Sequence, residues 1–244
     1  MPRHSYTYKA LNGLVGKAIH RYDMIGDGDR IAVGLSGGKD SLTLLWALGE
    51  RRNRIPVDYD LQPIYVDPGF AGGFGDDLEA TCRDMGYPLI VDRTDHGLVA
   101  HGPENRENPC FLCARLRRKR LFEIAADQGC NKLALGHNKD DIIETLFLNI
   151  CYAGEISTMV PRQEFFNGRF TVIRPLAMVD EKSICRFAAA QRLPRYTNPC
   201  PSAGNTKRSE IKTMLAELYR TNRKIKGNIY RAMSHVKTEY LLRS

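Results

Sequence analysis

The sequence lacks the features that would place a protein in a membrane or send it out of the cell. Its longest strongly apolar stretches, residues 31–35 and 42–48, are far shorter than the roughly 20 residues that span a bilayer. Its first residues contain no apolar segment followed by a small-residue cleavage site, so a secretory signal peptide is not indicated. We therefore expect a cytoplasmic protein that does not use a membrane and keeps its cysteines reduced.

Low-complexity sequence and general disorder are excluded as well. The chain has 244 residues, of which 43% are hydrophobic and 26% are charged, as in ordinary globular proteins. No internal repeat is evident. This length suits one domain of about 200 residues with an appendage, so a sizeable hydrophobic core can be buried.

Positive charge is concentrated in two places. The chain has a net charge of +8, and residues 205–244 contain ten Lys or Arg against three Glu. In residues 115–120, five of six side chains are basic. A solvated helix face would explain one such run, but two of them favour a polyanionic partner such as nucleic acid. An anionic membrane is the weaker alternative, because the tail has no Trp. The RNA-binding candidates are Arg115, Arg117, Arg118, Lys119, Lys207, Arg208, Arg223 and Lys224.

Helical and strand patterns alternate along the chain. Helices are predicted over residues 8–22, 41–51, 76–85, 114–128, 139–151, 181–192 and 207–240, and strands over 30–35, 59–66, 88–91, 132–135 and 170–173. Such alternation predicts an α/β fold with a doubly wound parallel sheet, whose ligands bind beyond the carboxyl ends of the strands. We expect a leading helical segment over 1–28, the α/β domain over 29–180, and a basic helical extension over 181–244.

A glycine loop follows the first predicted strand. Its residues are Ser36, Gly37, Gly38, Lys39, Asp40 and Ser41. Glycines let backbone N–H groups approach a phosphate, serine hydroxyls can donate hydrogen bonds, and a helix N-terminus favours anions. The loop is not a Walker motif, because Val33 stands at the first glycine position and Asp40 follows the lysine. The alternative is a tight turn in which Ser41 caps the helix.

Three of the seven cysteines form a second candidate site. Cys110 and Cys113 are spaced as in zinc, iron–sulfur and dithiol sites, and Cys200 lies in a turn between two prolines. Three cysteine ligands suit a 4Fe-4S cluster with one open iron or a catalytic zinc. The alternative for Cys110 and Cys113 is that they are two packed thiols without a metal. Arg117 and its basic neighbours are expected to lower the thiol pKa values. The other four cysteines, Cys82, Cys130, Cys151 and Cys185, are predicted to lie in the core.

Two further strings extend the pattern. Residues 135–145, Leu-Gly-His-Asn-Lys-Asp-Asp-Ile-Ile-Glu-Thr, follow a strand and open a helix, and residues 172–176, Val-Ile-Arg-Pro-Leu, close the last strand. Together with the glycine loop and the cysteines, these strings resemble the tRNA 2-thiocytidine-forming sulfurtransferases, a family of PP-loop ATP pyrophosphatases. The resemblance covers nearly the whole chain.

The resemblance implies a specific reaction. In that family, ATP adenylates the 2-oxo group of a cytidine at position 32 of the tRNA anticodon loop, and sulfur from a donor such as a cysteine desulfurase or sulfide replaces the activated oxygen. AMP and pyrophosphate are released. The resemblance further implies Mg²⁺ and allows a homodimer. Its 4Fe-4S cluster would have Cys110, Cys113 and Cys200 as ligands.

Site residues follow from the same resemblance. Candidates for ATP or its metal are Ser36, Gly37, Gly38, Lys39, Asp40, Ser41, Asp67, Gly136, His137 and Arg174, and the catalytic candidates are Asp140, Asp141, Cys110 and Cys113. Helix N-capping is the alternative role for the two acids, a buried ion pair for Arg174, and turn formation for Asp67.

Other functions stay open at this point. A related 2-thiouridine-forming enzyme is one alternative, although such relatives often carry extra cysteine pairs at both chain ends. Here the first cysteine is Cys82 and the last is Cys200. A lysidine-forming ligase would need the glycine loop but no cysteines. A non-catalytic, redox-sensing nucleic-acid binder would bind tRNA without releasing AMP.

Overall fold

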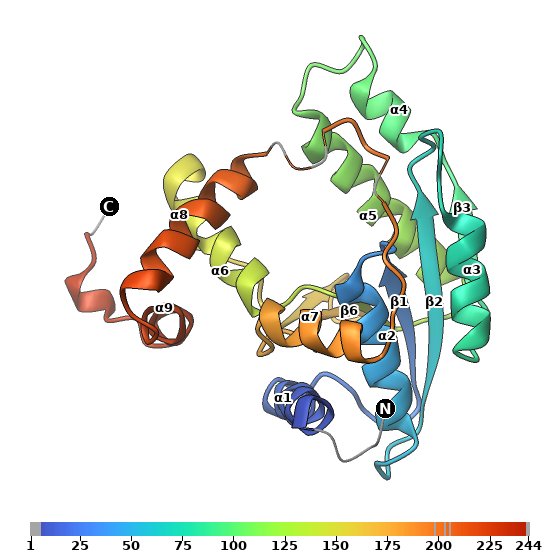
Figure 1. The fold of residues 1–244 in the computed structure, drawn as a ribbon, viewed down its shortest axis with the longest axis horizontal. Coiled ribbons are helices and arrows are strands. Elements are labelled where there is room, and N and C mark those ends of the chain that lie inside the picture. The colour runs from blue at the N-terminus through green and yellow to red at the C-terminus, as the bar shows by residue number, and fades with distance from the viewer. Residues whose placement is uncertain (1–5, 198, 203, 205, 243–244) are drawn as a thin grey trace. The chain divides into compact units, whose positions relative to one another are not determined.

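A six-stranded sheet organises the larger part of the protein. The computed structural model describes residues 6–197, 199–202, 204 and 206–242. The strands are β1 (Asp29–Leu35), β2 (Tyr59–Asp67), β3 (Ile90–Arg93), β4 (Lys132–Leu135), β5 (Arg162–Phe165) and β6 (Phe170–Ile173). They lie in the order β3-β2-β1-β4-β6-β5, and all neighbours are parallel except β5, which runs antiparallel to β6. Figure 1 shows β3, β2 and β1 in this order.

Helices connect the strands and continue beyond them. They are α1 (Tyr6–Arg21), α2 (Lys39–Arg52), α3 (Gly75–Asp84), α4 (His96–His101), α5 (Pro109–Asp127), α6 (Lys139–Leu148), α7 (Glu181–Ala190), α8 (Lys207–Thr221) and α9 (Ile225–Ala232), with a π-helical turn η1 (Asn149–Ala153) and a 3-10 turn η2 (Thr238–Tyr240). Among the described residues, no helix is both long enough and apolar enough to cross a membrane.

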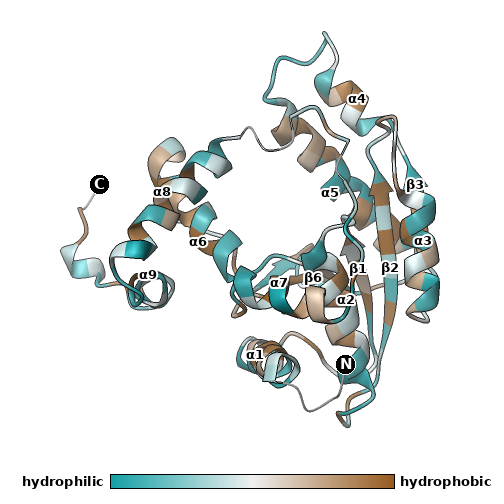
Figure 2. Cartoon of the chain, in the orientation of Figure 1, coloured by the Kyte–Doolittle hydropathy of each residue, from teal (hydrophilic) through white to brown (hydrophobic). Residues whose placement is uncertain are grey.

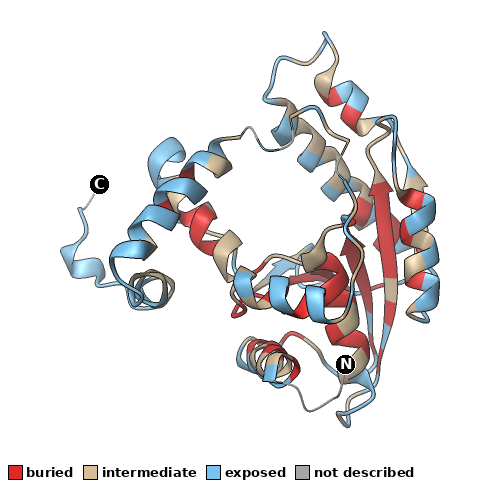
Figure 3. Ribbon diagram, in the orientation of Figure 1, coloured by how far each residue is buried: buried red, intermediate tan, exposed pale blue. Residues whose placement is uncertain are grey.

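The sheet has an apolar layer on each face. Along β1, Ile31 and Val33 pack with the buried side chains of α1, α2 and α7, whereas Ala32 packs with those of α5. This alternation follows from the period of two along a strand. Because both faces are covered, β1 and β2 are largely buried and mostly apolar (Figures 2 and 3).

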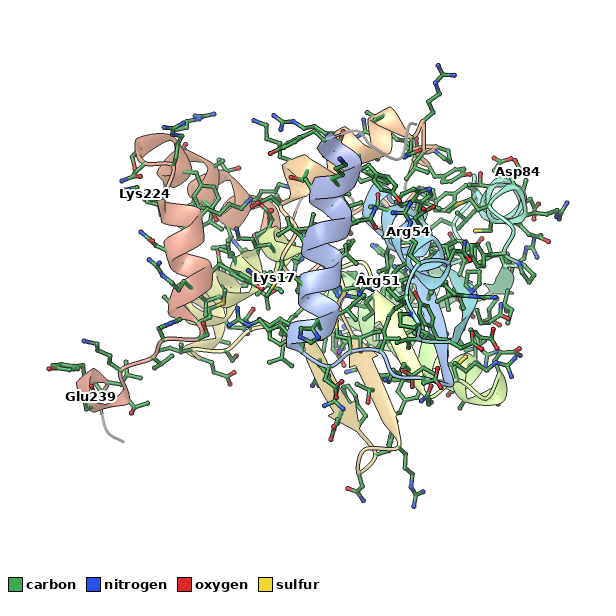
Figure 4. The ribbon with its side chains drawn as sticks, turned by 90° about the horizontal axis from the view of Figure 1, so that it is seen from below. Lys17, Arg51, Arg54, Asp84, Lys224 and Glu239 are labelled. Carbon is green, nitrogen blue, oxygen red and sulfur yellow. The ribbon has the colours of Figure 1, made fainter. Side chains whose placement is uncertain are left out.

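The leading helix α1 is held against α2 by polar as well as apolar contacts. The Tyr8 hydroxyl donates to a Glu50 carboxylate oxygen at 2.8 Å, and the Arg54 guanidinium lies 5.0 Å from the Tyr8 ring centroid. Gly16 allows close approach, because a Cβ there would lie 2.7 Å from an Arg51 nitrogen. Figure 4 shows Arg51 and Arg54 beside α1.

The order in which the chain adds strands to the sheet reverses between β1 and β4. From β1 the chain goes outward to β2 and β3, and it then returns to place β4 on the other side of β1. The loops after β1 and β4 therefore leave the same edge of the sheet side by side. A Cβ at Gly136, after β4, would lie 3.0 Å from the backbone nitrogen of Ser41. Ligands of doubly wound sheets bind at such a switch point.

The described residues divide into two compact units. The first contains residues up to 138 and 160–202, and the second contains residues 139–159 and those from 204 onward. This division differs from the expected boundary at residue 181. Helix α7 belongs to the first unit because Ile184 and Phe187 join the core of α1 and α2. In the second unit, Ile143 of α6 packs against Ile211 and Leu215 of α8.

The predicted α/β class with a mostly parallel sheet is confirmed, and the differences are local. Helix α4 and the edge strand β5 were not predicted. A left-handed turn at Phe166, Asn167 and Gly168, all with positive φ, lets β5 pair with β6. The single helix expected over 207–240 is divided, because the chain is extended at Asn222.

Candidate functional site

Two serines fold the glycine loop between β1 and α2. The backbone N–H of Ser36 donates to the Ser41 hydroxyl at 3.2 Å, and that hydroxyl donates to the Gly38 carbonyl at 3.0 Å. The two hydroxyl oxygens are themselves 3.2 Å apart. Helix α2 begins at the next residue, Lys39. The arrangement places a glycine loop and a helix N-terminus at the carboxyl edge of the sheet, which is how proteins bind phosphates.

An aromatic stack lies against this loop. Gly37 has φ +71°, and a Cβ there would meet the Phe74 ring at 2.2 Å. The Phe74 ring lies between Tyr65, with centroids 5.3 Å apart, and Tyr196, at 4.9 Å. The Tyr196 hydroxyl donates to the Asp77 carbonyl at 3.0 Å. Neither Phe74 nor Tyr196 was a candidate, although the glycine-rich sequence around Phe74 was visible.

Lys39 is held by two carboxylates. Its ammonium group donates to Asp40 at 3.0 Å and to Glu181, at the start of α7, at 3.1 Å. Burial acts to lower the pKa of Lys39, but the two carboxylates raise it above its ordinary value, so the side chain stays charged. The Asn138 amide donates to the other oxygen of Asp40 at 3.2 Å. Asn138 and Glu181 are thus two site residues that were not predicted.

Arg174 follows β6 and is buried. Its Nη1 donates to the Val160 carbonyl at 2.6 Å, and its Nε donates to Nδ1 of His137 at 3.4 Å. Burial, helped by the nearby charge of Arg118, lowers the pKa of Arg174 to about 10, so it is still charged at pH 7. Within the described residues no carboxylate pairs with it. The alternative of a structural ion pair is therefore not observed, and the arrangement favours an anionic ligand.

Arg174→Gln is expected to raise the free energy of unfolding of the anion-free protein by about 1–3 kcal/mol, because a buried charge without a counter-ion destabilises the folded state. Glutamine can still donate to the Val160 carbonyl. The same substitution should reduce the stabilisation that added pyrophosphate gives. Thermal unfolding with and without pyrophosphate measures both effects. Equal stabilisation of both proteins by pyrophosphate would contradict a role in binding anions.

Asp67 ends β2 within the same edge of the sheet. One of its carboxylate oxygens accepts from the backbone N–H of Gly69 at 2.9 Å, and its backbone carbonyl accepts from Thr94. These contacts are those of a turn, which was the alternative role. A part in nucleotide binding stays a prediction.

Helix α5 sets the spacing of the first two cysteines. The Asn108 side chain caps the helix by accepting from the backbone N–H groups of Cys110 and Phe111 at 3.0 and 3.3 Å. This cap fixes the start of the helix, with Cys110 in its first turn and Cys113 at the beginning of its second. Arg117 lies one turn further along the same face, because side chains four residues apart are neighbours on a helix.

Cys200 lies in the same unit as this pair. Burial raises the pKa of Cys113, Arg117 lowers it, and the neighbouring Cys200 and Cys110 raise it. The expectation that arginines would lower this thiol pKa is wrong, because burial outweighs them. Both Cys110 and Cys200 are thus near enough to act on the Cys113 thiol. Among the described residues, no three His, Cys, Asp or Glu side chains are gathered tightly enough to hold a metal as they stand.

The remaining four cysteines only partly follow the prediction. Cys82 and Cys130 are buried, as predicted, but Cys151 and Cys185 are exposed. Cys151 lies in the exposed π-helical turn η1, and Cys185 lies on the outer side of α7, away from buried Ile184. No disulfide joins any of the seven cysteines, all of which the structure describes.

Asp140 and Asp141 lie in the first turn of α6, in the second unit. Asp140 pairs with Lys226 of α9 at 2.5 Å, and Asp141 pairs with Arg208 of α8 at 3.3 Å. Arg208 also donates to the Thr145 hydroxyl at 3.0 Å. Each acid therefore already has a basic partner from the tail, and Arg208 is occupied by protein contacts.

The other RNA-binding candidates lie mostly on the surface. Arg115 pairs with Glu107 at 3.0 Å and Lys207 with Glu210 at 3.0 Å, but exposed pairs of this kind contribute little and are easily exchanged. Exposed candidates also include Arg118, Lys119, Arg223 and Lys224. Arg117 is half-buried, and its buried Nε has no hydrogen-bond partner among the residues that the structure describes. Their role in binding RNA stays a prediction.

The loop sequence Ser-Gly-Gly-Lys-Asp-Ser at the switch point of a parallel sheet defines the class of PP-loop ATP-binding proteins. A family model described as a PP-loop domain matches residues 12–218. The chain is 41% identical over 238 residues to the tRNA-cytidine(32) 2-sulfurtransferase of Geobacter sulfurreducens, covering 96% of this chain and 93% of that protein. Identity to the protein of the same name from Geotalea daltonii is 42% over 239 residues, with 96% and 94% covered. The chain belongs to this family of tRNA-cytidine(32) 2-sulfurtransferases, as the sequence motifs predicted.

A solved structure is also similar. The U34-tRNA thiolase NcsA from Methanococcus maripaludis, determined with its [4Fe-4S] cluster, matches with a TM-score of 0.79 and 27% identity. The match covers 97% of this chain and 80% of that one. The similarity therefore extends over both units of the present structure.

Proposed function

We propose that the protein is an ATP-dependent tRNA sulfurtransferase that converts a cytidine at position 32 of the anticodon loop to 2-thiocytidine. The observation that carries this proposal is the combination, in one unit, of the folded glycine loop with the Cys113 thiol and two further thiols, Cys110 and Cys200, that lie near enough to raise its pKa. A ligase would need only the loop. Relatives of about 40% identity over nearly the whole chain bear the corresponding name.

ATP would bind over the loop after β1. Backbone N–H groups of Gly37 and Gly38, the hydroxyls of Ser36 and Ser41, and the Lys39 ammonium would hold the departing pyrophosphate. The buried Arg174 guanidinium would supply a further positive charge, with His137 and Gly136 beside it. Mg²⁺ would be held with the help of Asp40, whose carboxylate stands at the loop.

The three cysteines fit an iron–sulfur cluster by the chemistry of their donors. Thiolates are the ligands that Fe–S clusters prefer, and Cys110, Cys113 and Cys200 provide three of them. Bound there, a 4Fe-4S cluster would supply an iron position at which sulfur can be held next to the substrate. The protein's own part is to keep three thiols together, with Arg117 offsetting their negative charge.

The acids of α6 and the basic surface would complete the reaction. Asp140 or Asp141 would hold a metal or take a proton, once released from its basic partner in the tail. Exposed arginines and lysines of α5 and the tail would bind tRNA phosphates, which attract Lys and Arg strongly. Sulfur would come from a desulfurase or sulfide, and a homodimer is compatible with these assignments.

A 2-thiouridine-forming activity is the second candidate. It is favoured by the similarity to NcsA, a U34-tRNA thiolase, at a TM-score of 0.79. Both candidates use the same loop and cysteines and differ only in the base that enters the site.

Deleting the gene and measuring the thiolated nucleosides of total tRNA by mass spectrometry tests the proposal. We expect selective loss of 2-thiocytidine, restored by the wild-type gene on a plasmid. Loss of a 2-thiouridine with 2-thiocytidine retained would replace the first candidate by the second. An unchanged profile of both nucleosides would refute tRNA thiolation.

A further inference from the structure

The turn that carries Cys200 is held by a histidine from another part of the chain. We propose that His101, the last residue of α4, is a positioning residue that keeps this turn beside Cys110 and Cys113 and so controls how firmly the cysteines retain iron. The inference rests on the proposed function, because it concerns the cysteines that the proposal makes cluster ligands.

The contacts of the His101 ring define its role. Its Nδ1 lies 2.9 Å from the Gly97 carbonyl, and its Nε2 lies 2.8 Å from the Ser202 hydroxyl and 4.0 Å from the Cys200 sulfur. Since a carbonyl can only accept, Nδ1 carries the proton and Nε2 of the neutral ring is an acceptor. In this tautomer the Ser202 hydroxyl donates to Nε2.

Helix α4 is itself well anchored. The Gly97 backbone N–H donates to the Pro68 carbonyl at 2.8 Å, and the Asn105 amide donates to the Ala100 carbonyl at 2.7 Å. The Phe70 ring stands edge-on to the His101 ring at 5.4 Å. Helix α4 also packs against α5, the helix that carries the other two cysteines. His101 thus connects the Cys200 turn to the element next to Cys110 and Cys113.

A second anchor holds the chain before the turn. Tyr196 stacks on Phe74, and its hydroxyl bonds to Thr81 at 2.7 Å and to the Asp77 carbonyl. Tyr196 lies four residues before Cys200, and Ser202 lies two residues after it. Tyr196 before the third thiol and Ser202 after it are therefore both held by contacts with other parts of the chain. Groups that orient metal ligands in this way typically change metal affinity about 10- to 100-fold when removed.

Four variants test the inference: His101→Ala, His101→Gln, Ser202→Ala and, as a matched control, His20→Ala on the exposed side of α1. Each full-length protein is reconstituted anaerobically with iron and sulfide, and loss of iron to a ferrous chelator is followed by visible absorbance. In the iron-free proteins, the alkylation rates of Cys200 and Cys113 by iodoacetamide are compared by mass spectrometry. Melting temperatures are recorded in parallel.

We expect His101→Ala to lose iron about tenfold faster than the wild type and its Cys200 to be alkylated several-fold faster. Glutamine can place an acceptor near the position of Nε2, so His101→Gln should recover most of both properties. Ser202→Ala removes the same hydrogen bond without altering α4, so it should show a smaller change in the same direction. If His101→Ala does not fold, Ser202→Ala serves as the test. His20→Ala should match the wild type.

Wild-type rates of iron loss and of Cys200 alkylation in both His101→Ala and Ser202→Ala would overturn the inference. A wild-type protein that binds no more iron than Cys200→Ser would instead refute the proposed cluster. In that case the alkylation rates still decide whether His101 holds the turn, so the two failures are distinguishable.

Discussion

Cys200→Ser is expected to abolish retention of the iron–sulfur cluster and to lower tRNA thiolation by about 100-fold or more, since a serine hydroxyl is a poor ligand for iron. No second cysteine lies in the turn to replace it, because Cys185 is the cysteine before it in sequence and lies on the exposed side of α7. Iron and sulfide content, together with 2-thiocytidine formed per tRNA, provide the measurement.

Cys185→Ser is the matched control, because it removes an exposed thiol from the same unit and should leave both quantities unchanged. Full thiolation by a Cys200→Ser protein that contains no iron would contradict the proposed role of the cluster. Loss of activity with the iron retained would assign Cys200 to sulfur transfer instead of cluster binding.

Gly37→Ala is expected to lower the affinity for ATP by at least about tenfold and to destabilise the protein by about 2–4 kcal/mol. Two effects add. An L-residue at φ +71° is strained, and its Cβ would meet the Phe74 ring at 2.2 Å. That ring cannot move aside freely, because Tyr65 and Tyr196 lie on its two faces. Isothermal titration with ATP and thermal unfolding measure the two losses.

Gly72→Ala separates strain from crowding. Gly72 also has a positive φ, +79°, but a Cβ there would meet nothing within 4 Å, so only the backbone cost of about 1 kcal/mol is expected. A smaller side chain at position 74 should also relieve the crowding. Adding Phe74→Leu to Gly37→Ala should therefore recover part of the lost stability. Equal effects of the Gly37 and Gly72 substitutions would show that the Phe74 contact is unimportant.

The parallel core and its phosphate loop could be predicted because their signals are local. The apolar run before Ser36, the two glycines and the following helix are contiguous in sequence, and β4 has the predicted bounds of 132–135. Likewise, Gly136, His137 and Arg174 were expected at strand ends, and the parallel topology brings those ends to one edge.

Other parts of the site depend on contacts between distant residues and have no local signal. Nothing in the sequence distinguishes Glu181 from the other acidic residues. Its role depends on α7, which places it beside Lys39, 142 positions earlier in the chain. His101 contacts the Cys200 sulfur at 4.0 Å although the two residues are 99 positions apart in the chain. The pKa of Cys113 likewise depends on burial, which the sequence motif does not reveal.

The second unit is assembled from two separate stretches of chain, which constrains how its basic tail can be studied. Ile143, from the first stretch, is fully buried by Ile211 and Leu215 from the second. Truncating the chain after residue 204 would expose this apolar surface and leave Asp140 without Lys226. Loss of RNA binding by a truncated protein would then report misfolding as much as missing charge. Exchanging exposed charges, such as Lys224 (Figure 4), keeps the scaffold intact and isolates the electrostatic contribution.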